Sequence, residues 1–99
     1  MNPYQAPLAD MRFLLEQVFD APNTWSKLPE IAEMVDMDTA NAILEEAAKI
    51  SAELIHPLNR AGDEQGVLHQ DNRVITPYGY KAVYDQYSQG GWVGLCGEP

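Results

Sequence analysis

Apolar residues recur at helical spacing in three stretches of the 99-residue chain. Successive apolar side chains lie three or four residues apart there, which places them on one side of a helix. The stretches cover about residues 7–20, residues 36–58 and residues 76–90. Their apolar stripes are Leu8, Met11, Leu14, Leu15, Val18 and Phe19, then Ile43, Leu44, Ala47, Ile50, Leu54 and Leu58, and finally Tyr80, Val83, Tyr84 and Tyr87. The pattern predicts an all-α fold, a small helical array whose three stripes share one core.

Residues that favour helix ends bound the second and third stretches. Asp36 or Asp38 can accept backbone N–H bonds at the start of the second helix. Pro57 lacks the N–H that an inner helical position donates, so it should kink or end that helix. Thr76-Pro77 combines a capping residue with a proline at the first helical position, and Gly90 allows the left-handed turn that stops a helix.

The segments between the stretches give weaker signals. Residues 24–27 suit a single helical turn, and residues 30–35 are too few to assign by spacing. Residues 62–73 are polar and contain glycine, which predicts a surface loop. Residues 67–69 could be extended, but a lone strand has no partner to pair with, so we expect no strand.

Side-chain pairs add local detail to this scheme. Glu45 and Lys49, and likewise Lys81 and Asp85, lie four residues apart and are expected to form ion pairs on helix surfaces. Phe13 is the exception in the first helix, because its spacing places it on the polar side.

The chain is acidic, with a formal net charge of −9. Twelve of its fifteen acidic residues lie in the first 66 positions. Such a surface repels phosphate backbones and anionic lipid, which argues against nucleic-acid and membrane-surface binding. No apolar run approaches the ~20 residues of a membrane span, and no secretory leader pattern is present. A single cysteine, Cys96, fits a reducing, cytoplasmic location.

No group of residues is arranged for catalysis or metal binding. His56 and His69 are separated by a proline and a loop, and a cysteine nucleophile at position 96 has no base nearby. The neighbouring carboxylates of residues 45–46 point about 100° apart on a helix and cannot act together. Residues 90–94 are glycine-rich but lack the lysine of a phosphate-binding loop. Asp63, Glu64 and Asp71 are too scattered for a calcium loop.

Four segments, in order, resemble the N-terminal part of an acyl-CoA dehydrogenase, in the branch with an extra N-terminal segment. They are residues 4–15 with 18–20, residues 42–49, residues 57–64, and residues 76–81 with Tyr87 and residues 90–94. Residues 30–38 depart from the family pattern. The resemblance implies a partial N-terminal helical domain, with an extension over residues 1–35 and the start of the helical domain over residues 36–99, cut off at its C-terminal end.

The resemblance also implies the function of a longer parent enzyme. Such enzymes use FAD to dehydrogenate acyl-CoA thioesters across the α and β carbons, pass electrons to an electron-transfer flavoprotein, and often form homo-oligomers. Their catalytic base and most flavin contacts follow the region matched by this chain. We therefore expect no catalytic, cofactor-binding or metal site among these residues, no FAD bound by the fragment, and no activity from it alone. The alternative is an independent acidic helical module that binds a protein partner.

Overall fold

The computed structural model describes residues 4–98, which divide into two compact units. The first unit comprises residues 5–51, and the second comprises residues 52–98 together with Tyr4. The described chain is mostly helical, with one short two-stranded sheet. The predicted fold class is therefore confirmed.

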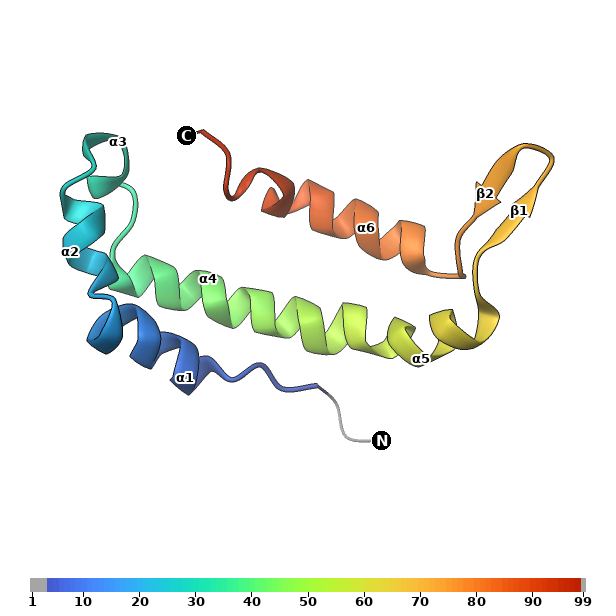
Figure 1. The fold of residues 1–99 in the computed structure, drawn as a ribbon, viewed down its shortest axis with the longest axis horizontal. Coiled ribbons are helices and arrows are strands. Elements are labelled where there is room, and N and C mark those ends of the chain that lie inside the picture. Colours follow the sequence, from blue (N-terminus) through green and yellow to red (C-terminus); the bar gives the residue numbers. More distant parts are fainter. Residues whose placement is uncertain (1–3, 99) are drawn as a thin grey trace. The chain divides into compact units, whose positions relative to one another are not determined.

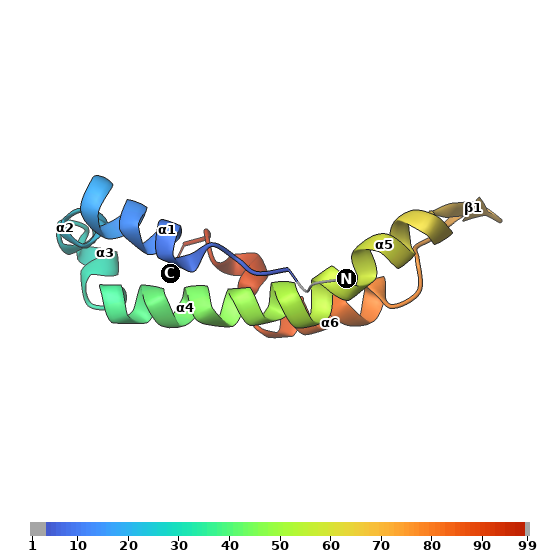
Figure 2. The same cartoon turned by 90° about the horizontal axis from the view of Figure 1, so that it is seen from below.

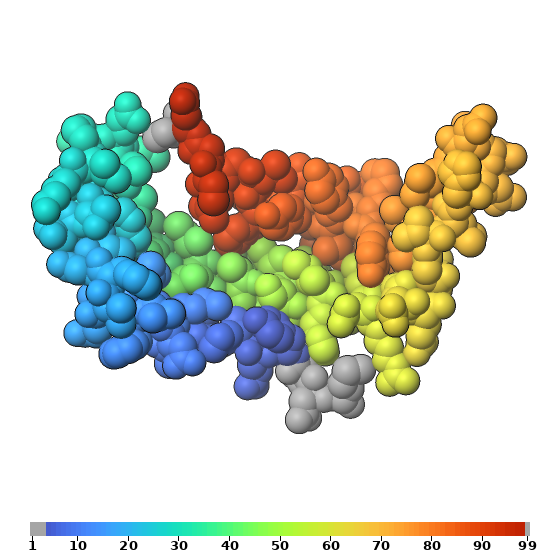
Figure 3. All heavy atoms as spheres, viewed as in Figure 1, coloured from blue at the N-terminus to red at the C-terminus, as the bar shows by residue number. Residues whose placement is uncertain are grey.

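The first unit pairs two helices in antiparallel fashion (Figures 1 and 2). Helix α1 (Leu8–Phe13) continues into a π-helical turn, η1 (Leu14–Val18), and α4 (Met37–Ile50) runs back beside α1. The short helices α2 (Ala21–Ser26) and α3 (Pro29–Ala32) connect them. Side chains of α1 lie against those of α4 in the space-filling view (Figure 3). The first predicted helix and the single turn near residues 24–27 are thus found.

Helix α4 begins where its capping residue predicts. The Oδ1 atom of Asp36 accepts a hydrogen bond of 2.7 Å from the backbone N–H of Thr39. This bond lowers the pKa of the Asp36 carboxyl, because it favours the charged form. Of the two predicted caps, Asp36 is the one that the structure uses.

The second unit contains a helix that sequence reasoning ended too early. The π-helical turn η2 (Ser51–Ile55) leads from the first unit into α5 (His56–Gln65), and Pro57 lies in the first turn of α5. A π-helical turn changes the hydrogen-bond spacing just before the proline, so its missing N–H does not stop the helix. The helix ends instead at Gly66, whose φ of +72° is left-handed. Of the two effects expected of Pro57, a kink or an end, the end was wrong, and residues 62–65 belong to α5 rather than to the predicted loop.

A hairpin follows in place of the predicted loop. Strand β1 (Leu68–Gln70) pairs antiparallel with β2 (Arg73–Ile75), with Leu68 opposite Ile75. Asp71 and Asn72 form the connection, with φ values of 53° and 61°. Positive φ at both positions is the mark of a type I′ turn, which matches the twist of paired strands. The expectation of no strand was wrong because residues 73–75 supply the missing partner.

Helix α6 (Tyr80–Gln89) begins later than its sequence signals indicate. Thr76-Pro77 does not open it, because a turn intervenes in which the Tyr80 N–H donates to the Pro77 carbonyl over 3.2 Å. Gly79 occupies this turn with φ of +90°. At the other end the left-handed residue is Gly91 rather than Gly90, one position later than predicted, and the 3₁₀ turn η3 (Trp92–Gly94) follows.

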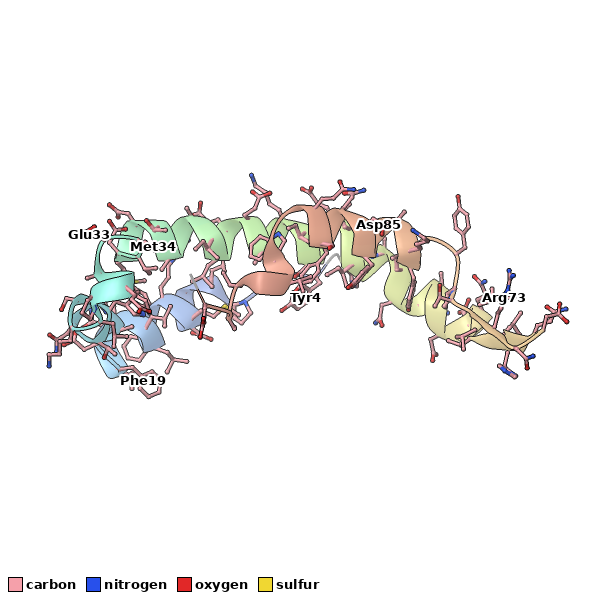
Figure 4. All side chains as sticks on the ribbon, turned by 90° about the horizontal axis from the view of Figure 1, so that it is seen from above. Tyr4, Phe19, Glu33, Met34, Arg73 and Asp85 are labelled. Carbon is pink, nitrogen blue, oxygen red and sulfur yellow. The ribbon has the colours of Figure 1, made fainter. Side chains whose placement is uncertain are left out.

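Few of the described side chains are buried in either unit. Ala40, at 8% exposure, is the buried hydrophobic residue of residues 4–98. Several large apolar side chains of the first and third stripes are exposed, and Phe19 reaches 67% (Figure 4), whereas the stripe from Ile43 to Leu58 is half-buried. The core shared by three stripes stays a prediction. Phe13 is exposed, as its position on the polar side of the first helix predicts.

Candidate functional site

An apolar groove in the second unit is a concave feature of the described chain that could receive another group. It has a volume of about 340 Å³ and is called the tyrosine groove below. Its lining residues come from the helical run η2–α5 and from α6: Ile55, Leu58, Tyr80, Val83, Tyr84 and Tyr87.

Helical spacing explains why one face of α6 supplies most of the lining. Tyr80, Val83, Tyr84 and Tyr87 follow the i, i+3, i+4, i+7 pattern, which brings their side chains to one side of a helix. The sequence predicted this stripe as core. The structure brings its members together, but Tyr84 remains 60% exposed and Ile55, across the groove, 45%. The stripe is therefore grouped as predicted, but it is not buried as a core.

A glycine allows the two helices to approach at one end of the groove. Gly62 in α5 is buried, and a Cβ built there would lie 2.6 Å from Cζ of Tyr80. Real Cβ atoms essentially never come so close to another heavy atom, so a larger residue would displace the tyrosine ring. Sequence reasoning missed Gly62, which it placed in a loop.

The turn before α6 fixes the same end of the groove. The backbone N–H of Tyr78 donates to Oε1 of Gln65 over 3.1 Å, which ties the turn to the end of α5. A Cβ added to Gly79 would lie 2.8 Å from Cδ2 of Leu58, so this glycine also leaves room for a lining residue. Backbone conformation and packing both require glycine there.

The groove carries no charged side chain in its lining. The charged residues of α6 include Lys81 and Asp85, and Asp85 is labelled in Figure 4. Their side chains form the predicted ion pair at 2.9 Å. This hydrogen bond to Asp85 raises the pKa of Lys81, because it favours the ammonium form. Among the side chains of the lining residues, the three tyrosine hydroxyls are the polar groups, and such a surface is suited to binding apolar groups.

A polar cluster in the first unit joins α1 to α4. Arg12 Nε donates to Asn41 Oδ1 over 3.0 Å, and Arg12 Nη2 donates to Glu45 Oε1 over 2.8 Å. Glu45 is therefore paired with Arg12, and Lys49 lies 4.0 Å from Glu46 instead. The predicted Glu45–Lys49 pair was wrong, because a guanidinium held by two acceptors competes better than a mobile lysine. This cluster fastens two helices.

The residues considered for metal or nucleophilic chemistry do not converge. His56 starts α5, His69 lies in β1 and Cys96 is exposed after η3. Within residues 4–98, no three histidine, cysteine or acidic side chains are close enough to hold a metal ion. Glu45 and Glu46 make separate ion pairs, as their different directions on α4 imply.

The tyrosine groove also does not fit FAD. The cofactor's diphosphate requires cationic groups or converging backbone N–H groups, and the lining has no basic residue. Residues 90–94 follow the end of α6 as a turn and η3, rather than forming a loop between a strand and a helix. The lining of the tyrosine groove can therefore make mainly apolar contacts.

The sequence is similar to that of an acyl-CoA dehydrogenase, whereas no family model matches it. The similar protein is 3-methylmercaptopropionyl-CoA dehydrogenase of Ruegeria pomeroyi, with 38% identity over 92 residues. The alignment covers 93% of this chain but 15% of that enzyme. The resemblance inferred from the four segments is confirmed, and the chain corresponds to a fragment of an acyl-CoA dehydrogenase.

Proposed function

We propose that the chain is the N-terminal structural part of an enzyme that dehydrogenates acyl-CoA thioesters across the α and β carbons with FAD. The observation that carries this proposal is the 38% identity to an acyl-CoA dehydrogenase across nearly the whole chain. The chain spans 15% of that relative, which leaves ample polypeptide for the cofactor and the catalytic base. The extension over residues 1–35 and the helical domain from residue 36 remain predictions within this proposal.

The fragment itself contributes helices rather than chemistry. Its apolar groove lacks charged residues, and the described histidines, cysteine and carboxylates are dispersed. We therefore expect the isolated chain to bind no FAD and to show no turnover. FAD and the acyl-CoA thioester would be held mainly by residues of the larger enzyme.

The same proposal includes the electron acceptor, the assembly and the location of the parent enzyme. The parent passes electrons to an electron-transfer flavoprotein, forms a homo-oligomer and acts in the cytoplasm. The exposed, unpaired Cys96 is in keeping with a reducing compartment. No helix within residues 4–98 has the length and hydropathy of a membrane span.

Expression of a longer polypeptide that contains these 99 residues tests the proposal. It should purify with a flavin absorbance spectrum and reduce a dye acceptor when a panel of acyl-CoA thioesters is supplied. The 99-residue chain is the control, and it should do neither. A colourless longer protein without turnover would refute the proposal, and stoichiometric FAD binding by the short chain would refute our assignment of the site. Monomeric, tightly folded behaviour of the short chain would favour the independent interaction module.

A further inference from the structure

We propose that the tyrosine groove is a docking surface for one apolar helix from the rest of the same polypeptide. This inference rests on the proposed function, because it requires the longer enzyme of which the chain is a fragment. It adds a defined surface, lined by Leu58 and Tyr84 among others, and a defined kind of occupant.

The shape of the groove indicates a helix as the occupant. The lining stripe of α6 follows a helical row of side chains, and Ile55 and Leu58 form the opposite wall. A third helix can place its own ridge of side chains between two such walls. The large exposed aromatic and aliphatic side chains are of the type that dominates buried contacts, as the 60% exposure of Tyr84 illustrates.

Charge and chain length indicate that the occupant belongs to the same polypeptide. A second copy of this chain would bring together two bodies that each carry a net charge of −9, which mutual repulsion opposes. The related enzyme is several times longer than the aligned region, which amounts to 15% of it. Covalent connection gives such a segment a high effective concentration at the groove.

The structure contains a matched pair of tyrosines for testing this proposal. Tyr84 lies in the groove, whereas Tyr78 lies in the turn before α6 and is 90% exposed. Hydroxyl-radical footprinting of the intact, unmodified enzyme gives an oxidation rate for each tyrosine by mass spectrometry. The same enzyme unfolded in urea gives the rate for full exposure.

A covered groove should slow oxidation of Tyr84 by about fivefold or more relative to the unfolded enzyme, because packed interface atoms exclude solvent. An open groove should leave the rate within about twofold, in line with the exposure of Tyr84 in the fragment, and would overturn the proposal. Tyr78 reports whether the reagent reaches this part of the enzyme.

Two further conditions identify the occupant. Protection that disappears on dilution would assign the groove to a second copy, and protection that requires added acyl-CoA would assign it to substrate. Either result overturns the proposal. A photo-crosslinking residue introduced at position 84 should form its crosslink within one chain, to an apolar helical peptide outside these 99 residues.

Dehydrogenase activity of the same preparation separates this inference from the proposed function. An active enzyme with a freely oxidised Tyr84 would refute docking at the groove and leave the function standing. An inactive, flavin-free enzyme with a protected Tyr84 would refute the function and leave the docking surface standing.

Discussion

The two units join their helices by different means. In the first unit, Arg12 of α1 holds Asn41 and Glu45 of α4 by two hydrogen bonds at a partly exposed position. In the second unit, α5 and α6 meet where Gly62 leaves room for the ring of Tyr80. A polar fastening tolerates small displacements and is screened by solvent, whereas a close steric fit tolerates no added atom. The two contacts should therefore respond very differently to substitution.

The largest effect is expected from Gly62→Ala. The added methyl group would overlap the Tyr80 ring, and overpacking of this kind costs about 1–3 kcal/mol. Native-state hydrogen exchange of the α6 amides in the intact enzyme measures the loss. In a Tyr80→Ala background the obstacle is gone, and the same substitution should stabilise α5 by about 0.5–1 kcal/mol through helix propensity. An equal loss in both backgrounds would contradict the steric explanation.

The hairpin of the second unit tests whether backbone fit matters there as much as packing. Asn72 has a φ of 61°, which a β-branched residue adopts poorly. Asn72→Val should weaken the hairpin by about 1–2 kcal/mol, and Asn72→Gly should strengthen it by about 0.5 kcal/mol. Exchange rates of the β1 and β2 amides report both changes. Similar rates in the two variants would count against a type I′ turn.

The Arg12 contact should be weaker than the glycine contact. Its side chain is 34% exposed and that of Glu45 62%, so solvent screens the pair. Arg12→Ala should cost about 0.5–1 kcal/mol in the exchange stability of α1, and added salt should reduce the difference. Arg12→Lys should lose most of the same free energy, because one ammonium cannot reproduce the two-pronged geometry. If Arg12→Lys kept the full exchange stability of α1, positive charge alone would account for the contact.

The smallest effect concerns the capping bond of α4 and its dependence on pH. The folded-state pKa of Asp36 lies below its unfolded value, so the stabilisation is complete well above the unfolded value of about 3.9 and is lost as the pH falls through the folded value. Asp36→Asn keeps the hydrogen-bond acceptor without the titration, and its α4 amides should exchange independently of this carboxyl. Asp36→Ala should weaken the cap at neutral pH, and its difference from the native protein should shrink as the carboxyl becomes protonated. If the native protein and Asp36→Asn showed the same pH dependence of α4 amide exchange, the Asp36 carboxyl would not be its cause.

Local chemistry made much of the fold predictable from the sequence. Apolar spacing located the main helices, Asp36 marked the start of α4, and Lys81 and Asp85 paired as their spacing implies. Two errors arose where a partner outside the local pattern decides, far along the chain in the first case and across a two-residue turn in the second. Glu45 pairs with Arg12 from another helix rather than with Lys49, and residues 73–75 pair with a strand that looked isolated.

The tyrosine groove was partly visible in the sequence. The stripe on α6 was correctly grouped, but its burial was overestimated because the number of helices available to cover it cannot be read from spacing. Gly62 was missed because glycine near polar residues usually signals a loop. The Asp71-Asn72 pair was a usable signal for the hairpin, since both residues tolerate left-handed backbone conformation better than most.

The helical run α4–η2–α5 has different turns on the two sides of Pro57. The residues after it continue as an ordinary helix to Gln65, whereas the turn before it, η2, is a wider π turn. Replacement of this proline by alanine would restore a donor and let the narrower α turn compete, which would rotate Ile55 relative to Leu58 by up to a fraction of a turn. Because the Pro57 nitrogen carries no hydrogen, this residue thus influences how Ile55 and Leu58 are spaced on one wall of the groove.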